Sequence, residues 1–104
     1  MALNVADYVA TQPTLELVMQ PQLASVLFRS RPQQMAGSDD AAIALLNQRV
    51  GDALLASGRA NVGVTEHNGV TCLKLTLLNP IVTLEDVKVL LSLVERTAQE
   101  LLAQ

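Results

Sequence analysis

The sequence predicts an α+β domain in which three helices pack on one face of a four-stranded antiparallel sheet. The dipeptide Asn68-Gly69 separates two runs of alternating apolar residues, a pattern that strongly indicates a β-hairpin. Residues 39–57 and 83–102 repeat apolar side chains at helical spacing between recognisable start signals and ends. The elements follow the order helix, strand, strand, helix, strand, strand, helix, which favours helices layered on a sheet.

The first third of the chain is expected to form one short helix and two strands. Residues 3–11 carry apolar side chains at helical spacing and stop before Pro13. Residues 14–19 alternate between apolar and polar and predict a strand, and Pro21 marks the turn into a second strand over about 24–31. The helix is expected to bury Leu3, Ala6, Val9 and Ala10.

The central helix is expected to begin at Asp39 and Asp40, because negative side chains suit the positive end of the helix dipole. It should run to Ser57, with Gly58 in the left-handed position that closes many helices. Its predicted buried stripe consists of Ile43, Leu46, Val50 and Leu54.

The hairpin is expected to pair residues 61–67 with residues 70–78. Asn-Gly tolerates the positive φ angles of a type I′ turn, and a two-residue turn fixes the register. One face then presents apolar residues to a core, namely Val62, Val64, Leu73, Leu75 and Leu77. The other face is sparse and partly polar, with Gly63, Thr65, Cys72, Lys74 and Thr76.

The last helix is expected to start with a capping box between Thr83 and Asp86, supported by apolar contact between Val82 and Val87. It should run nearly to Leu102. Its apolar stripe is Val87, Leu90, Leu91, Val94, Ala98 and Leu101.

Composition limits the functional classes. A chain of 104 residues fits one domain. Only 16% of its residues are charged, against about 25% in a typical soluble domain, which indicates a surface that something else normally covers. A net charge of −3 with 2% aromatic residues argues against nucleic-acid binding. No apolar run is long enough to cross a membrane and no signal peptide is evident, so a cytoplasmic location is expected.

Most of the reactive side chains have structural explanations. Cys72 lies in mid-strand opposite Thr65 and is expected to be a packing residue, and His67 lies at the hairpin turn. A single cysteine with a single histidine does not make a structural zinc site, so no metal site is expected. We therefore expect no catalytic residue here.

Other charged side chains also have ordinary explanations, with one exception. Glu85 and Asp86 suit the first turn of a helix. Arg29 and Arg31 share one face of a strand, usually a solvated edge, although an anion contact stays open. Lys74 is the exception, because a mid-strand lysine opposite a glycine requires either water or an anion beside its ammonium group.

Several short motifs in the order of the elements resemble the end of pyridoxal-phosphate-dependent decarboxylases of the glutamate and aromatic-amino-acid type (group II). They are Leu23-Ala-Ser-Val-Leu-Phe-Arg, Ser57-Gly-Arg-Ala, Val62-Gly-Val-Thr, Asn68-Gly, Cys72-Leu-Lys-Leu-Thr-Leu-Leu-Asn-Pro and Thr83-Leu-Glu-Asp-Val. The resemblance covers about residues 14–103. The run around Lys74 looks most like the bacterial branch that acts on L-2,4-diaminobutyrate or lysine.

The resemblance implies that residues 1–104 are the C-terminal small domain of a fold-type-I enzyme, usually a homodimer. Pyridoxal phosphate would be held by a large domain of the same chain, so the fragment alone is expected to bind no cofactor and to be inactive. The small domain would close the active-site cleft over an amino-acid substrate. The family commonly has arginine at the position of Lys74, where it resembles an anchor for the substrate carboxylate. Lysine keeps the charge but loses the bidentate geometry.

An alternative interpretation is a stand-alone regulatory module that binds a small ligand or self-associates. A cofactor lysine encoded upstream in the same reading frame would favour the enzyme, whereas a natural start at Met1 would favour the module.

Overall fold

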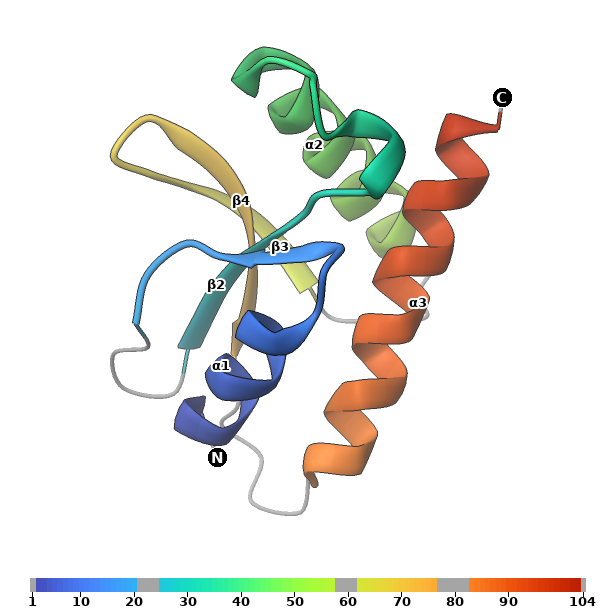
Figure 1. Cartoon of the computed structure of the whole chain (residues 1–104). Coiled ribbons are helices and arrows are strands. Elements are labelled where there is room, and N and C mark those ends of the chain that lie inside the picture. The colour runs from blue at the N-terminus through green and yellow to red at the C-terminus, as the bar shows by residue number, and fades with distance from the viewer. Residues whose placement is uncertain (1, 21–24, 58–61, 77–82, 104) are drawn as a thin grey trace.

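A computed structural model describes residues 2–20, 25–57, 62–76 and 83–103. Figure 1 shows the elements in the predicted order. They are α1 (Ala2–Thr11), β1 (Leu15–Leu17), β2 (Ser25–Ser30), a 3₁₀ helix η1 (Gln33–Met35), α2 (Asp40–Ser57), β3 (Val62–His67), β4 (Val70–Thr76) and α3 (Leu84–Leu102). The predicted α+β class is confirmed, and η1 is an additional turn within the expected loop.

The four strands form one antiparallel sheet in the order β1-β2-β4-β3. The sheet joins two hairpins through β2 and β4, where Val26 pairs with Leu75 and Phe28 pairs with Leu73. All three helices lie against one face of the sheet (Figure 1), and side chains from each of them join the hydrophobic core formed there. The helix face of the sheet is therefore the buried face.

The β3–β4 hairpin has the predicted turn and register. Asn68 and Gly69 have φ angles of 51° and 80°, both in the left-handed region that a type I′ turn requires. Every predicted pair from Val62↔Leu75 to His67↔Val70 is present. The turn chemistry therefore predicted the register of the described hairpin residues correctly.

The buried face of α1 differs from the prediction. Val5, Ala6 and Val9 are buried, whereas Leu3 is 65% exposed and Ala10 is also exposed. At 100° per residue, positions 5, 6 and 9 share one side of a helix, whereas positions 3 and 10 lie about 90–110° from the middle of that side. The spacing predicted the helix correctly but assigned it the wrong rotation about its axis.

The longer helices bury the predicted stripes. In α2 the four predicted residues are buried, and in α3 Val87, Leu91, Val94 and Ala98 are buried while Leu90 and Leu101 pack partly against the core. The predicted features at Pro21, Gly58, Leu77 and Val82 lie outside the described residues. No helix within the described ranges is both long and apolar enough to cross a membrane.

The capping box at the start of α3 is present. The Thr83 hydroxyl accepts from the Asp86 N–H at 3.1 Å, and the Asp86 carboxylate accepts from the Thr83 N–H at 3.0 Å. The Thr83 N–H, and to a smaller extent the Thr83 side chain, holds the pKa of Asp86 below its ordinary value.

This lowered pKa predicts how the contribution of Asp86 changes with pH. A carboxyl group with a lowered folded-state pKa stabilises the fold fully above its unfolded-state pKa, and that contribution is lost as the pH falls through the folded-state pKa. Urea unfolding should therefore show that Asp86→Asn is less stable than the natural chain at neutral pH and that the difference shrinks in acid. A difference independent of pH would contradict this role.

Candidate functional site

The face of the sheet opposite the helices holds the candidate site, and we call it the open face. Strand alternation places the residues between the core positions on it. Its exposed or half-buried residues are Ser25, Leu27, Gly63, Thr65, Lys74 and Thr76. Arg29 and Cys72 lie on the same face closer to the hairpin turn, and both are buried.

Lys74 occupies the middle of this face. Its strand is central, and its paired neighbours are Leu27 on β2 and Gly63 on β3. The side chain is exposed and forms no ion pair with any described residue. A side chain built at Gly63 would meet nothing within 4 Å, so the space beside the lysine is open. The ammonium group is therefore free to meet an anion that approaches this face.

Cys72 lies on the same row as Lys74 but is completely buried. Burial raises the pKa of the Cys72 thiol, and the neighbouring positive charge of Arg29 offsets only part of this effect. The thiol is accordingly protonated at neutral pH and is a poor nucleophile. The expectation that Cys72 is a packing residue agrees with its complete burial.

Arg29 is not on a solvated edge, so that expectation was wrong, and the residue instead makes the anion contact that the sequence left open. Its side chain is 4% exposed, and its Nη1 donates to Asp40 Oδ1 at 2.7 Å. The carboxylate at the start of α2 thus binds the arginine near the end of β2 through a charge-assisted hydrogen bond. Arg31 behaves as expected, because it is exposed and pairs with Glu16 at 3.2 Å.

The remaining reactive side chains have local structural contacts. His67 is half-buried beside the turn, with its ring Nε2 at 3.3 Å from the side-chain nitrogen of Asn68. Glu85 pairs with Lys88 at 3.4 Å on the surface of α3. Within the described part of the chain, no three His, Cys, Asp or Glu residues gather as metal ligands would.

Asn47 is an important residue that the sequence reasoning missed. It is completely buried in α2, accepts from the Ser30 N–H at 2.7 Å and donates to the Ser30 and Ile43 carbonyl oxygens at 3.0 and 2.9 Å. The signal was present, because position 47 lies on the side of α2 that carries Ile43 and Val50. A polar residue in a buried stripe usually has a specific hydrogen-bonding role.

Comparison with known proteins gives a consistent result. L-2,4-diaminobutyrate decarboxylase from Acinetobacter baumannii is 46% identical over 98 residues, which cover 94% of this chain. The glutamate decarboxylase domain of a diaminobutyrate-pyruvate transaminase and L-2,4-diaminobutyrate decarboxylase from Vibrio parahaemolyticus superposes over 95% of this chain with a TM-score of 0.84 and 36% identity. No family model matches the chain.

A more distant similarity shows the same fold. Oryza sativa TDC, solved with PLP and tryptamine, matches 96% of this chain and 21% of its own with a TM-score of 0.81 and 23% identity. In sequence and fold, the chain thus corresponds to part of the amino-acid decarboxylases, as its motifs indicated. A relative that the chain resembles in sequence is the Acinetobacter L-2,4-diaminobutyrate decarboxylase, and the chain spans 19% of that protein and 20% of the Vibrio structure.

The open face does not by itself fit pyridoxal phosphate. Among the described residues, its exposed part offers Lys74, beside Gly63 and Leu27, while the exposed Arg31 already pairs with Glu16. A phosphate site usually combines several backbone N–H groups with a helix N-terminus, and an exposed lysine in mid-sheet does not supply them. We therefore derive no chemical step of the cofactor from these residues.

Proposed function

We propose that this chain is the C-terminal small domain of a pyridoxal-phosphate-dependent amino-acid decarboxylase that acts on L-2,4-diaminobutyrate. The observation that carries the proposal is the 46% identity to a decarboxylase of that name, which extends over 94% of the chain. The similarity includes almost every element rather than one motif, so it favours a shared role for the whole unit.

The open face is the surface that would meet the rest of the enzyme. The matched proteins are about five times longer than the matched segment, as their coverage of 19 and 20% indicates. Antiparallel sheets can leave one face to water, but a low content of charge favours a surface that becomes covered. In this proposal the large domain and cofactor lie opposite the open face, and the small domain closes the cleft and excludes water.

The proposal also includes the assembly and location of the whole enzyme. Four large apolar side chains are exposed on the helices, and two of them, Leu45 and Leu55, lie on α2 at 61 and 72% exposure. Burial of such side chains by a second subunit or domain is favourable, because it removes apolar surface from water. We propose a homodimer in the cytoplasm, in which this domain contributes structure rather than the cofactor lysine.

Lys74 is the residue that we propose to bind the substrate carboxylate. Its central position, exposure and lack of an ion pair with the described residues leave its charge available. A lysine attracts the carboxylate as a point charge, with less control of direction than an arginine fork provides. Its role would be to orient the substrate so that the bond to the carboxylate is correctly placed for cleavage.

The function is tested by comparing this 104-residue chain with the longer protein encoded by the same reading frame. The longer protein should bind pyridoxal phosphate stoichiometrically in equilibrium dialysis and release carbon dioxide from L-2,4-diaminobutyrate. The 104-residue chain alone should do neither. Stoichiometric binding by the short chain, or a reading frame that encodes only these residues, would contradict the proposal.

Lys74→Ala in the longer enzyme should raise KM or lower kcat, with a combined loss in kcat/KM of about tenfold or more if the charge contacts the carboxylate. Lys74→Arg should retain most of the activity. Lys88→Ala is the matched control, because Lys88 lies on α3 near Glu85 and the Tyr8 ring, away from the open face. Equal kinetics for the alanine variants at positions 74 and 88 would remove Lys74 from the site.

A further inference from the structure

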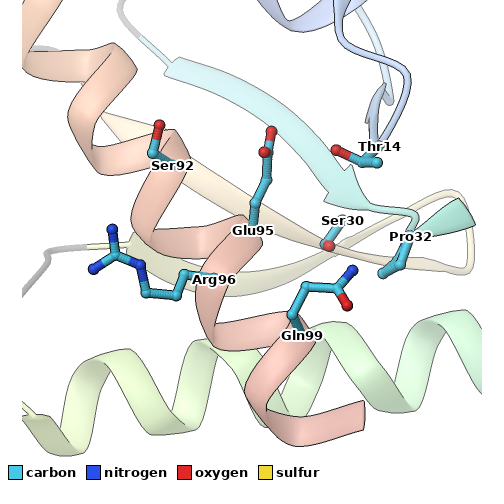
Figure 2. A pocket seen from close by; sticks show the side chains of 7 residues that line it. All are labelled: Thr14, Ser30, Pro32, Ser92, Glu95, Arg96 and Gln99. Carbon is cyan, nitrogen blue, oxygen red and sulfur yellow. The ribbon is translucent and has the colours of Figure 1, made fainter. Parts of the chain in front are cut away.

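A cavity of about 220 Å³ lies on the helix side of the sheet, opposite the face that carries Lys74. Figure 2 shows the cavity between α3 and the ends of the first two strands. Thr14, Ser30 and Pro32 line it from the strand side, and Ser92, Glu95, Arg96 and Gln99 line it from α3. None of these residues has a role in the proposed reaction.

Two features of the sequence leave this space open. The side chains of β2 that face the core are Val26, Phe28 and Ser30. The last of them is a small serine, and a large apolar side chain at this position would fill the cavity. On α3 the lining residues recur at intervals of three and four, which places them on a polar strip beside the buried stripe. Strand and helix therefore border a partly open cavity in which polar side chains lie among apolar surface.

Ser30 provides a buried hydroxyl without a partner. The residue is 1% exposed, and its Oγ forms no hydrogen bond with the described residues. Asn47 satisfies both the backbone N–H and the carbonyl of Ser30, so the residue is held firmly while its side chain stays unpaired. Figure 2 shows this oxygen turned towards α3. A buried polar group left unpaired is costly, which favours a bound molecule that completes it.

Glu95 gives the cavity its charge preference. The residue is half-buried and has no cation within ion-pair distance among the described residues. In Figure 2 its carboxylate extends towards the side of the cavity where Thr14 lies, whereas the Arg96 guanidinium points in another direction. The Thr14 hydroxyl also lacks a partner among the described residues. The Glu95 carboxylate therefore supplies a negative charge on the side of the cavity where the Thr14 hydroxyl can act as an acceptor.

We propose that this cavity binds a small primary ammonium ion, with Glu95 as its counterion and the hydroxyls of Ser30 and Thr14 as further acceptors. An ammonium group has three N–H donors and no acceptor, which matches one carboxylate and two hydroxyls. A carboxylate ligand would be repelled by Glu95, which forms no ion pair with a described residue, and is disfavoured.

An ammonium site in this cavity would have a consequence for the enzyme. Removal of carbon dioxide from an amino acid leaves a primary amine, so the decarboxylase would carry a site for its product on the side of the sheet away from the cleft. This consequence rests on the proposed function, whereas ammonium binding by the cavity does not. The binding test below uses no cofactor and no catalytic activity, so the two proposals succeed or fail separately.

The test is a titration of the 104-residue chain with propylammonium chloride, followed by amide chemical shifts and calorimetry. We expect saturable binding, weak because the ligand has few heavy atoms, with shifts concentrated at Thr14, Ser30 and Glu95. Tetramethylammonium has the same charge but no N–H donor, and propanoate has the opposite charge, so both should bind at least about tenfold more weakly. No saturable binding of propylammonium, or preferential binding of propanoate, would overturn the proposal.

Two variants test the assigned contacts. Glu95→Gln keeps the shape and removes the charge, and Ser30→Ala removes a hydroxyl that no described residue bonds, so both should fold. Glu95→Gln should weaken propylammonium binding about tenfold or more. Ser30→Ala should weaken it several-fold. Glu100→Gln is the matched control, because Glu100 is exposed on α3 and does not line the cavity. If all three variants bind like the natural chain, the ion is held elsewhere and the proposal is wrong.

Discussion

Replacing Asn47 with leucine is expected to destabilise the fold by roughly 2–5 kcal/mol. The substitution removes one acceptor and two donor contacts at once, and it leaves the Ser30 N–H and the carbonyls of Ser30 and Ile43 without this partner. Burial of an unpaired polar group costs about 1–3 kcal/mol, which exceeds the gain from a larger apolar side chain at a completely buried position. Urea unfolding measures the change.

Gln48→Leu is the matched control for this prediction. Gln48 is the next residue in the same helix, is exposed, and loses only a hydrogen bond to Asp52 at 3.1 Å. A surface change of this kind usually alters stability by about 0.5 kcal/mol or less. Equal unfolding midpoints for the two leucine variants would show that Asn47 does not hold α2 to β2.

Asn47 also shows where prediction from the sequence reached its limit. Periodicity found all three helices because it depends on neighbours within one element, and the Asn68-Gly69 turn fixed the hairpin register for the same reason. Asn47 acts across 17 positions, on the end of β2. No local pattern specifies that partner, although an amide within a buried stripe is a usable signal that some partner exists.

The order of the strands has the same explanation. Each hairpin could be predicted from its own turn or spacing, but the contact of β2 with β4 joins residues about fifty positions apart. It is this contact that makes β4 central and places Lys74 in the middle of the open face. The identity of the candidate residue was thus readable from sequence, while its surroundings required the tertiary structure.

Arg29 illustrates a different limit. Strand alternation assigned it correctly to the face away from the core, and a charged residue there is usually solvated. Asp40 lies eleven positions along the chain at the start of α2, and the path of the loop between them brings the two charges together. The sequence contained both partners, but the loop geometry that unites them carried no recognisable motif.

Gly51 is the second position where a small substitution should have a large effect. It is buried within α2, and a Cβ atom there would clash with a γ-methyl carbon of Val64 and touch Leu73. Alanine in place of glycine inside a helix gains about 0.5–1 kcal/mol from backbone entropy. Overpacking costs about 1–3 kcal/mol, and the branched Val64 side chain has little rotamer freedom to yield. Gly51→Ala should therefore lose about 1–2 kcal/mol in spite of its higher helix propensity.

A double-mutant cycle distinguishes this clash from other causes. Val64→Ala alone should destabilise the chain, because it removes apolar side-chain atoms packed against the core. Combined with Gly51→Ala, it should cost less than the sum of the two single changes, because the smaller side chain at position 64 makes room for the new methyl group. Gly37→Ala is the matched control, since a Cβ at Gly37 meets nothing within 4 Å, and it should be neutral or slightly stabilising. Strict additivity at positions 51 and 64 would mean that close approach of α2 to β3 is not what requires glycine there.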